Sequence, residues 1–112
     1  MFYIKDIEHR TNVVDKILKI LKLGILNKKE KQDIFELVKS VDKTDLQKQR
    51  FYMVYNIEPN DEEENTYNKA SAFYNCSVGA IRSSVMSVVV ALYHVSDEKF
   101  SILESIYKKY EK

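Results

Sequence analysis

The chain has 112 residues, of which 45% are hydrophobic and 31% are charged, and its formal net charge is +1. This length and composition fit one globular domain over residues 1–112 and exclude a disordered or low-complexity chain. The single cysteine excludes an internal disulfide and suits a reducing compartment, and no long apolar run or signal-peptide core is present. We therefore expect a cytoplasmic protein without a membrane partner.

The small net charge hides an uneven distribution along the sequence. Residues 1–57 carry a net charge of +4, residues 58–65 carry −5, and residues 66–112 carry +2. An acidic segment over residues 58–64 thus interrupts a mildly basic chain. Such a distribution permits binding to nucleic acid without demanding it, and the role of the acidic segment stays open.

Helix-breaking residues are scarce, since the chain holds only two glycines and one proline. This scarcity and the apolar periodicity predict an all-α fold, a compact bundle of about six helices. The expected helices cover about residues 3–23, 27–40, 44–55, 66–74, 77–94 and 96–107. The side chains that can cap or end them are Gly24, Asn27 with Glu30, Thr44 with Gln47, Ser77, and Ser96. The apolar positions expected to face the core include Ile4, Ile7, Val14, Leu18, Leu21, Ile34, Leu37, Val38, Leu46, Phe51, Val54, Tyr55, Phe100, Leu103, Ile106 and Tyr107.

Residues 66–94 have the order of residue types that a helix-turn-helix requires. Ala70 and Tyr74 are apolar at i and i+4, and Ser71 is small enough to lie where two helices touch. Asn75 tolerates the left-handed backbone of a tight turn, and Ser77 can cap the helix that follows. Because the second helix of such a unit enters the DNA major groove, this segment predicts binding to double-stranded DNA.

The face of the second helix that would contact DNA lies opposite its apolar stripe, which is formed by Ile81, Val85, Val88 and Leu92. Arg82 is the only side chain there whose guanidinium can donate two hydrogen bonds to guanine N7 and O6. Serine hydroxyls and helix N-termini suit base edges or phosphates, and glycine allows close approach. The expected DNA-binding residues are Thr66, Lys69, Ser77, Val78, Gly79, Arg82, Ser83 and Ser84.

The same segment resembles the helix-turn-helix of bacterial sigma-70 region 4. The matching residues are Thr66, Ala70–Ser71, Tyr74–Asn75, Ser77 and Ile81–Arg82, and residues 46–57 resemble the helix before that motif. It is also similar to the C-terminal effector domain of the sporulation master regulator of Firmicutes, through Tyr67, Tyr74–Asn75 and the long helix over residues 77–93. The resemblance covers about residues 44–95 and implies a bacterial protein that binds DNA and controls transcription. The chain departs from these families at Asn68 or Lys69, where sigma factors commonly have an acidic residue, and at Ser83, Ser84, Met86 and Ser87, where the sporulation domain has a basic face.

A second apolar surface is expected on the helix over residues 77–94. Its members lie off the core stripe and are Met86, Val89, Val90 and Tyr93. Either the last helix covers them or they form the seam of a homodimer. In a dimer, two recognition helices would lie one DNA turn apart, as palindromic operators require.

The sequence shows no catalytic or metal-binding pattern. His9 and His94 are far apart, Cys76 has no histidine at ligand spacing, and no glycine-rich phosphate loop occurs. We expect no enzyme, metal or cofactor, but a sequence-specific DNA-binding transcription regulator. The alternative is a non-catalytic helical module that binds RNA polymerase or another regulator.

Overall fold

The computed structural model describes residues 4–55, 57 and 67–111, with the side chains of all of these except residues 4–6 and 68. Its helices are α1 (Ile4–Lys22), α2 (Lys28–Lys39), α3 (Asp45–Tyr55), α4 (Tyr67–Tyr74), α5 (Val78–Tyr93) and α6 (Asp97–Tyr110). Every regular element in this part of the chain is an α-helix. The predicted all-α fold of six helices is therefore confirmed.

Local hydrogen bonds explain where several helices begin. At α2, Asn27 Oδ1 accepts from the Glu30 backbone N–H at 2.8 Å, and Glu30 Oε1 accepts from the Asn27 N–H at 2.9 Å. Thr44 and Gln47 exchange the same pair of bonds before α3, both at 3.2 Å. The Ser96 side chain caps α6. These caps were expected because each depends only on residues three positions apart.

The end of α1 is also fixed locally. Gly24 has a φ of +74°, in the left-handed region that glycine adopts at low cost. The Ile25 N–H donates to the Ile20 carbonyl at 3.2 Å and the Gly24 N–H donates to the Leu21 carbonyl at 3.1 Å. This pair of bonds is a Schellman motif, which satisfies the last carbonyls of the helix. Gly24 therefore ends α1 as predicted.

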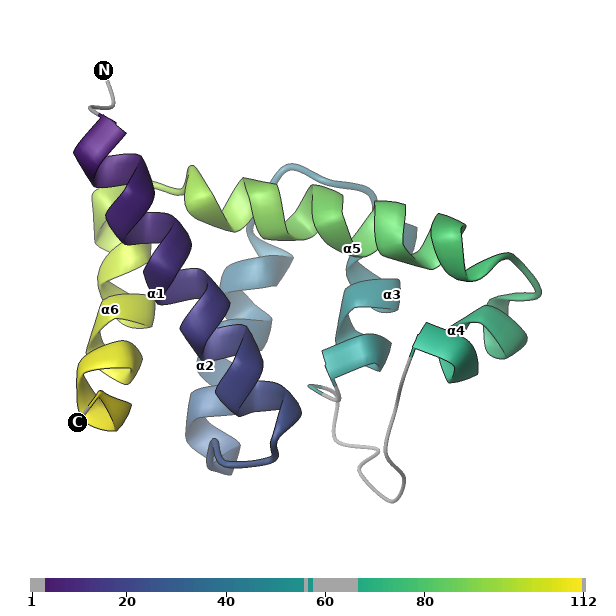
Figure 1. Ribbon diagram of the computed structural model, residues 1–112, viewed down its shortest axis with the longest axis horizontal. Coiled ribbons are helices and arrows are strands. Elements are labelled where there is room, and N and C mark those ends of the chain that lie inside the picture. The colour runs from purple at the N-terminus through teal and green to yellow at the C-terminus, as the bar shows by residue number, and fades with distance from the viewer. Residues whose placement is uncertain (1–3, 56, 58–66, 112) are drawn as a thin grey trace.

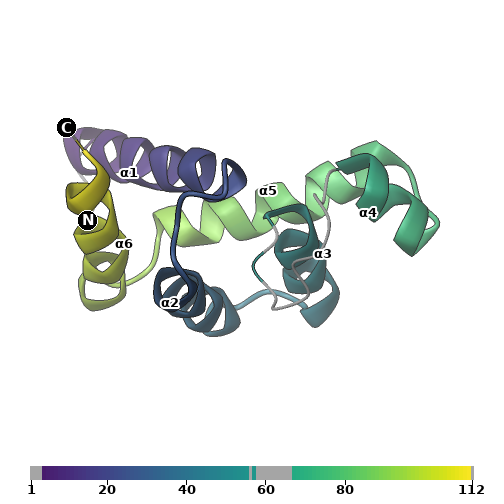
Figure 2. The ribbon, with the colours of Figure 1, turned by 90° about the horizontal axis from the view of Figure 1, so that it is seen from below.

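Helix α5 runs along the long direction of the molecule, and α1, α3 and α4 pack on it (Figure 1). It contacts α3 and α4 along its first part and α1 near its C-terminal end, while α6 packs on α1 and α2. The view from below shows α1 and α6 side by side at one end of the molecule and α4 at the other (Figure 2). The molecule measures 39 × 28 × 21 Å along its principal axes. The elongated shape leaves one side of α5 open to solvent.

A single apolar core runs under α5. Its fully buried side chains include Val13, Val14, Ile17, Ile34, Val38, Phe51, Val54, Ile81, Val85, Val88, Leu92 and Leu103. Most of the expected inward positions are buried, but Ile7, Tyr55 and Tyr107 are only half-buried and Leu46 is 47% exposed. Leu46 lies in the first turn of α3 and none of the described helices covers it, so the expectation of a buried Leu46 is wrong. The side chain of Ile4 lies outside the described part of the chain.

A buried arginine holds the corner between α5 and α6 against α1. Arg10 is 5% exposed, and its guanidinium donates to the Tyr93 carbonyl at 3.1 Å and to the Val95 carbonyl at 2.5 Å. It also pairs with Asp97 at 2.5 Å and lies 4.7 Å from the centre of the Phe100 ring. These contacts satisfy backbone carbonyls at the end of α5, which would otherwise need water.

A buried carboxylate ties the end of α6 to the start of α2. Glu30 is 7% exposed and accepts hydrogen bonds from Tyr110 Oη at 2.6 Å and Lys109 Nζ at 3.0 Å. Burial by itself raises the pKa of Glu30, but the hydrogen bonds from Tyr110, Asn27 and Lys109 and the charge of Lys109 outweigh it. The net pKa is therefore below the ordinary value of 4.5. Glu30 is thus held as a carboxylate in the fold.

Candidate nucleic-acid interface

The turn between α4 and α5 has the backbone that its sequence predicts. Asn75 has a φ of +52°, and it is the only described residue other than glycine with a positive φ. The Cys76 N–H donates to the Ser71 carbonyl at 3.1 Å and the Asn75 N–H donates to the Ala72 carbonyl at 3.3 Å. These bonds form a second Schellman motif, with Asn75 in the position that glycine usually takes. The expectation of a left-handed Asn75 is confirmed.

Two serines lock this turn from both sides. The Ser71 hydroxyl donates to the Cys76 carbonyl, and Ser77 Oγ accepts from the Ala80 backbone N–H at 3.1 Å. Ser71 thus bonds to the turn in addition to providing the small side chain that was predicted there. Ser77 is the N-cap of α5. The direction in which α5 leaves α4 is therefore set by hydrogen bonds within residues 71–80.

The inward face of α5 is the predicted one. Ile81, Val85, Val88 and Leu92 are each at most 2% exposed. They pack against α3 and α4 along the first part of α5 and against α1 further along. Because these positions repeat every three or four residues, the opposite face of α5 is directed to solvent.

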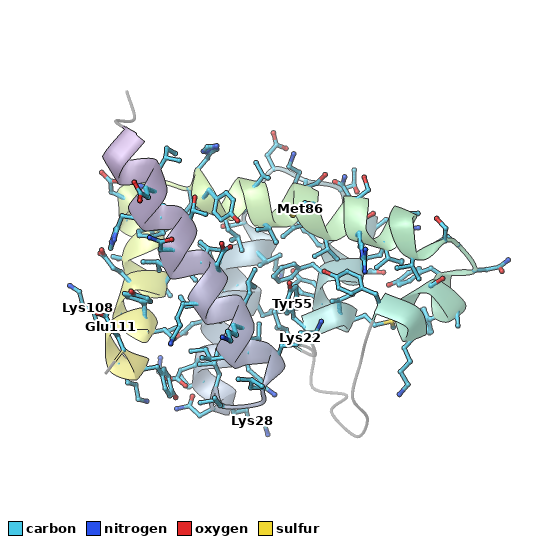
Figure 3. The ribbon with its side chains drawn as sticks, in the orientation of Figure 1. Lys22, Lys28, Tyr55, Met86, Lys108 and Glu111 are labelled. Carbon is cyan, nitrogen blue, oxygen red and sulfur yellow. The ribbon has the colours of Figure 1, made fainter. Side chains whose placement is uncertain are left out.

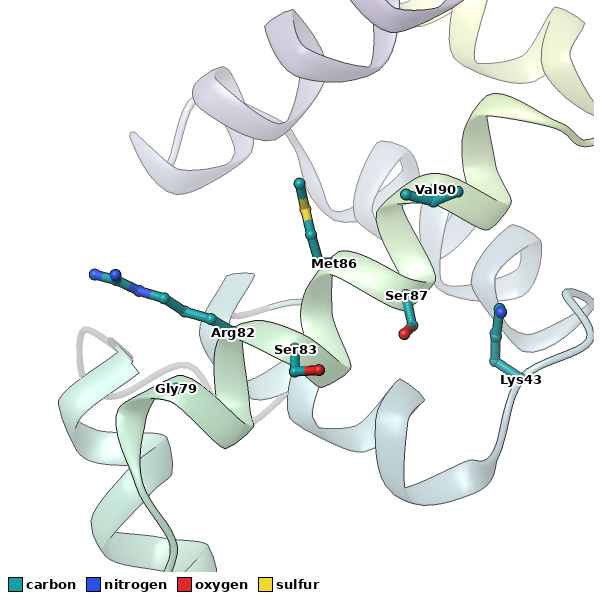
Figure 4. A pocket seen from close by; sticks show the side chains of 7 residues that line it. All are labelled: Lys43, Gly79, Arg82, Ser83, Met86, Ser87 and Val90. Carbon is teal, nitrogen blue, oxygen red and sulfur yellow. The ribbon is translucent and has the colours of Figure 1, made fainter.

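The solvent face of α5 carries two rows of residues, which we call the arginine row and the serine row. The arginine row is Arg82, Met86 and Val90, and the serine row is Gly79, Ser83 and Ser87, each spaced by four residues. Together with Lys43, which follows α2, they line a shallow depression of about 600 Å³ (Figure 4). In this view the side chains of Ser83 and Ser87 lie on the side of α5 nearer to Lys43, and Arg82 and Met86 on the other. The seven lining residues include two cations and no carboxylate.

Arg82 is exposed, and an aromatic ring lies beneath its guanidinium. The guanidinium is 5.4 Å from the centre of the Tyr67 ring, and Lys22 Nζ is 4.9 Å from the same ring and 5.9 Å from that of Tyr55. Figure 3 shows Lys22 and Tyr55 below α5. Burial and the hydrogen-bonded hydroxyl of Tyr67 raise the pKa of Tyr55 well above its usual range. Tyr55 is therefore neutral, and the rings of Tyr55 and Tyr67 bring two cations near the first turns of α5.

Other expected contact residues are placed on or near this face. Gly79 and Ser83 are exposed, Val78 is half-buried, and Lys69 is exposed on α4. A Cβ added at Gly79 would meet only Ser77 Oγ, at 3.8 Å, so the backbone is open to close approach there. Thr66 and the acidic segment over residues 58–64 lie outside the described residues.

Ser84 was expected among the DNA contacts, and that expectation is wrong. Ser84 is 7% exposed, and its hydroxyl accepts from Arg50 Nη1 at 2.8 Å. Arg50 comes from α3, and its guanidinium also lies 5.3 Å from the centre of the Tyr74 ring. Its Nε atom is buried and has no hydrogen-bond partner among the described residues. Ser84 and Arg50 therefore connect α3, α4 and α5 internally, and Ser84 cannot contact a ligand on the outer face.

The expected dimer seam divides into exposed and covered residues. Met86 is 55% exposed and Val90 is 44% exposed, but Val89 is 4% exposed and belongs to the core. Tyr93 is half-buried and donates to Asp15 of α1 at 2.9 Å; burial and this carboxylate raise the pKa of Tyr93 to about 12. The covering helix is thus α1, whereas the sequence suggested the last helix. The placement of Val89 in a dimer seam is therefore wrong, whereas that of Tyr93, which is only half-buried, stays a prediction.

Sequence reasoning missed Lys22, Lys43 and Tyr67 as neighbours of the outer face of α5. Lys43 lies 36 residues before Gly79 and Lys22 lies 60 residues before Arg82. No local pattern links residues at such separations. In the sequence, Tyr67 stands out only through the resemblance to the sporulation domain, and the position of Arg82 over its ring reveals the contact.

The described residues form neither a metal site nor a single membrane-spanning helix. Among residues 4–55, 57 and 67–111, no group of three or more His, Cys, Asp and Glu side chains could hold a metal ion. His9 pairs with Glu104 at 2.8 Å, and Cys76 is a half-buried free thiol. No single described helix is long and apolar enough to cross a membrane; α5 and α6 satisfy that test only when joined across a bend of 103°.

Comparison with known proteins yields no relative for this chain. It matches no family model, no curated protein and no solved structure.

Proposed function

We propose that this protein is a sequence-specific transcription regulator that binds double-stranded DNA through the outer face of α5. The observation that carries the proposal is the placement of Arg82. It lies exposed on a helix whose opposite face is buried, one turn after a capped N-terminus and a tight turn at Asn75. In DNA-binding helix pairs, residues at this position of the second helix contact base edges. The resemblance of residues 44–95 to DNA-binding domains of bacterial sigma factors and sporulation regulators supports the same function in a bacterial cytoplasm.

In this proposal the side chains near α5 have separate roles. Arg82 donates to guanine N7 and O6, and Ser83 reaches a neighbouring base edge or phosphate. Ser77 and Lys43 contact phosphates on either side of the groove, because a helix N-terminus and an exposed ammonium both attract anions. Tyr67 beneath the Arg82 guanidinium limits the conformations of its side chain, which reduces the entropy lost on binding.

Fluorescence anisotropy with a pool of random duplex DNA tests the proposal. The titration is made at several salt concentrations, and bound duplexes are amplified and sequenced. The proposal predicts binding that weakens steeply with salt and enriches one sequence motif, because phosphate contacts release counterions and base contacts select sequence. An absence of binding at low salt, where phosphate attraction is strongest, would refute it.

A second function, a protein-binding module, is favoured by one specific observation. Phe73 on α4 is 70% exposed, and Leu23 and Ile25 after α1 are 66% and 48% exposed. Exposed large apolar residues are common in protein interfaces. If the chain fails to bind DNA at low salt but binds purified bacterial RNA polymerase, and Phe73→Ser abolishes that complex, the protein-binding function replaces the first.

A further inference from the structure

The arginine row continues beyond Arg82 as an apolar strip. Met86 and Val90 follow Arg82 at successive intervals of four residues on the solvent face of α5. Both are exposed, at 55% and 44%, whereas the other large apolar side chains of α5 are buried or half-buried. The proposed function gives a role to Arg82 but none to these two side chains. An exposed apolar strip next to a base-contacting arginine therefore needs a ligand of its own.

We infer that Met86 and Val90 contact the 5-methyl groups of thymines in the major groove, so that the protein prefers sites with thymine close to the guanine bound by Arg82. The inference rests on the proposed function and specifies the sequence class that it selects. The thymine methyl is the apolar group that the major groove displays, and apolar side chains recognise it. At 1.5 Å per residue, Val90 lies about 12 Å along α5 from Arg82, which corresponds to roughly three or four base pairs.

The charge around the strip fits DNA. The depression that Met86 and Val90 line is flanked by the Arg82 and Lys43 cations, and none of its lining residues is acidic. A polyanion is attracted to such a surface, and its phosphates can meet the cations while base edges meet the apolar side chains. The serine row beside the strip adds hydroxyls that can bond to neighbouring bases.

A second copy of the chain fits this strip less well. A stable dimer buries about 800 Å² on each partner, and Met86 and Val90 are the only two of the four expected seam residues that remain exposed. Val89 is in the core and Tyr93 is bonded to Asp15. Two exposed apolar side chains are too small an area for such a seam.

The test uses the full chain and the duplex enriched from the random pool. Each thymine of that duplex is replaced in turn by deoxyuridine, which lacks only the 5-methyl group, and Kd is measured by anisotropy. We expect one or two replacements to weaken binding by the wild-type protein about fourfold each, the factor expected for one buried methyl group. Met86→Ala should bind the thymine and uracil duplexes equally at one of these positions, and Val90→Ala at the other. Ile102→Ala, which removes an exposed apolar side chain from α6, should keep the full preference for thymine.

The outcomes separate this inference from the proposed function. If the wild-type protein selects a motif but binds every uracil-containing duplex as tightly as the parent duplex, the inference is wrong and the regulator function stands. If no motif is enriched, the proposed function fails and this inference fails with it. If sedimentation shows a dimer that Met86→Ala dissociates while uracil has no effect, the strip is a dimer seam and the inference is overturned.

Discussion

Replacing the buried carboxylate of Glu30 should destabilise the fold by a measurable amount. Glu30 Oε1 accepts from both the Asn27 N–H and Tyr110 Oη, and Oε2 accepts from Lys109 Nζ. In Glu30→Gln the amide oxygen can keep the first two bonds, but the amide NH₂ would face the Lys109 ammonium, donor against donor. The substitution also removes the negative charge that strengthens all three bonds.

The expected loss for Glu30→Gln is about 1–2 kcal/mol of unfolding free energy, since bonds to charged groups contribute more than neutral ones. For a domain of this size, this loss lowers Tm by roughly 4–12 °C. The assay is urea unfolding followed by circular dichroism, with Glu36→Gln as the matched control. Glu36 is exposed on the same helix, and its side chain accepts a hydrogen bond from Gln32, which is exposed too. The control should change the stability by less than about 0.5 kcal/mol.

The stability difference between the wild type and Glu30→Gln should depend on pH. The pKa of Glu30 in the folded protein is lower than the ordinary value of 4.5 that applies to the unfolded chain. Ionisation of Glu30 therefore stabilises the fold fully at a pH above the unfolded-state pKa. This stabilisation is lost as the pH falls through the folded-state pKa. The stability difference between wild type and Glu30→Gln should therefore be largest near neutral pH and shrink below about pH 4. A Glu30→Gln variant as stable as Glu36→Gln at pH 7, or a difference that grows in acid, would refute the role assigned to Glu30.

Three further substitutions test other parts of the structure. Arg10→Ala should lower the unfolding free energy by about 2–4 kcal/mol, because it leaves the Tyr93 and Val95 carbonyls without their donor. Thermal unfolding measures this loss, and a loss no larger than that caused by Lys16→Ala at an exposed position would contradict it. Asn75→Ala should lower the unfolding free energy by about 1 kcal/mol in urea unfolding, whereas Asn75→Gly should not. The reason is that the positive φ disfavours a Cβ without a local polar group. Equal stability of the two variants would contradict the left-handed backbone at residue 75. Lys43→Ala should weaken DNA binding about equally for all sequences and reduce the salt slope by about 1; an unchanged slope would remove Lys43 from the phosphate contacts.

The sequence was most informative where structure depends on neighbours in the chain. The capping pairs Asn27–Glu30 and Thr44–Gln47, the caps Ser77 and Ser96, and the left-handed Asn75 each depend on contacts within five residues. Such contacts follow from side-chain chemistry and spacing alone. The buried stripe of α5 was also predictable, because its apolar period is regular.

Contacts between distant segments were the ones that sequence reasoning missed. Arg50 reaches Ser84 across 34 residues, which turns an expected surface hydroxyl into an internal bond. Burial of Arg10 and Glu30 depends on partners 83 and 80 residues away. The cover of the end of α5 by α1 was also missed, because the sequence suggested the last helix there and both helices have suitable apolar faces. Packing of that kind is determined by the whole fold and not by any local pattern.

The most direct test of the central proposal compares the affinities of one arginine variant and one lysine variant for the enriched duplex. Kd is measured for the wild type, Arg82→Ala and Lys108→Ala, the last removing an exposed cation on α6, away from α5. The proposal predicts that Arg82→Ala weakens binding by about 1–3 kcal/mol and no longer distinguishes guanine from other bases at one position, while Lys108→Ala binds like the wild type. Equal affinity and equal guanine preference for all three proteins would contradict the proposal that the outer face of α5 reads DNA sequence.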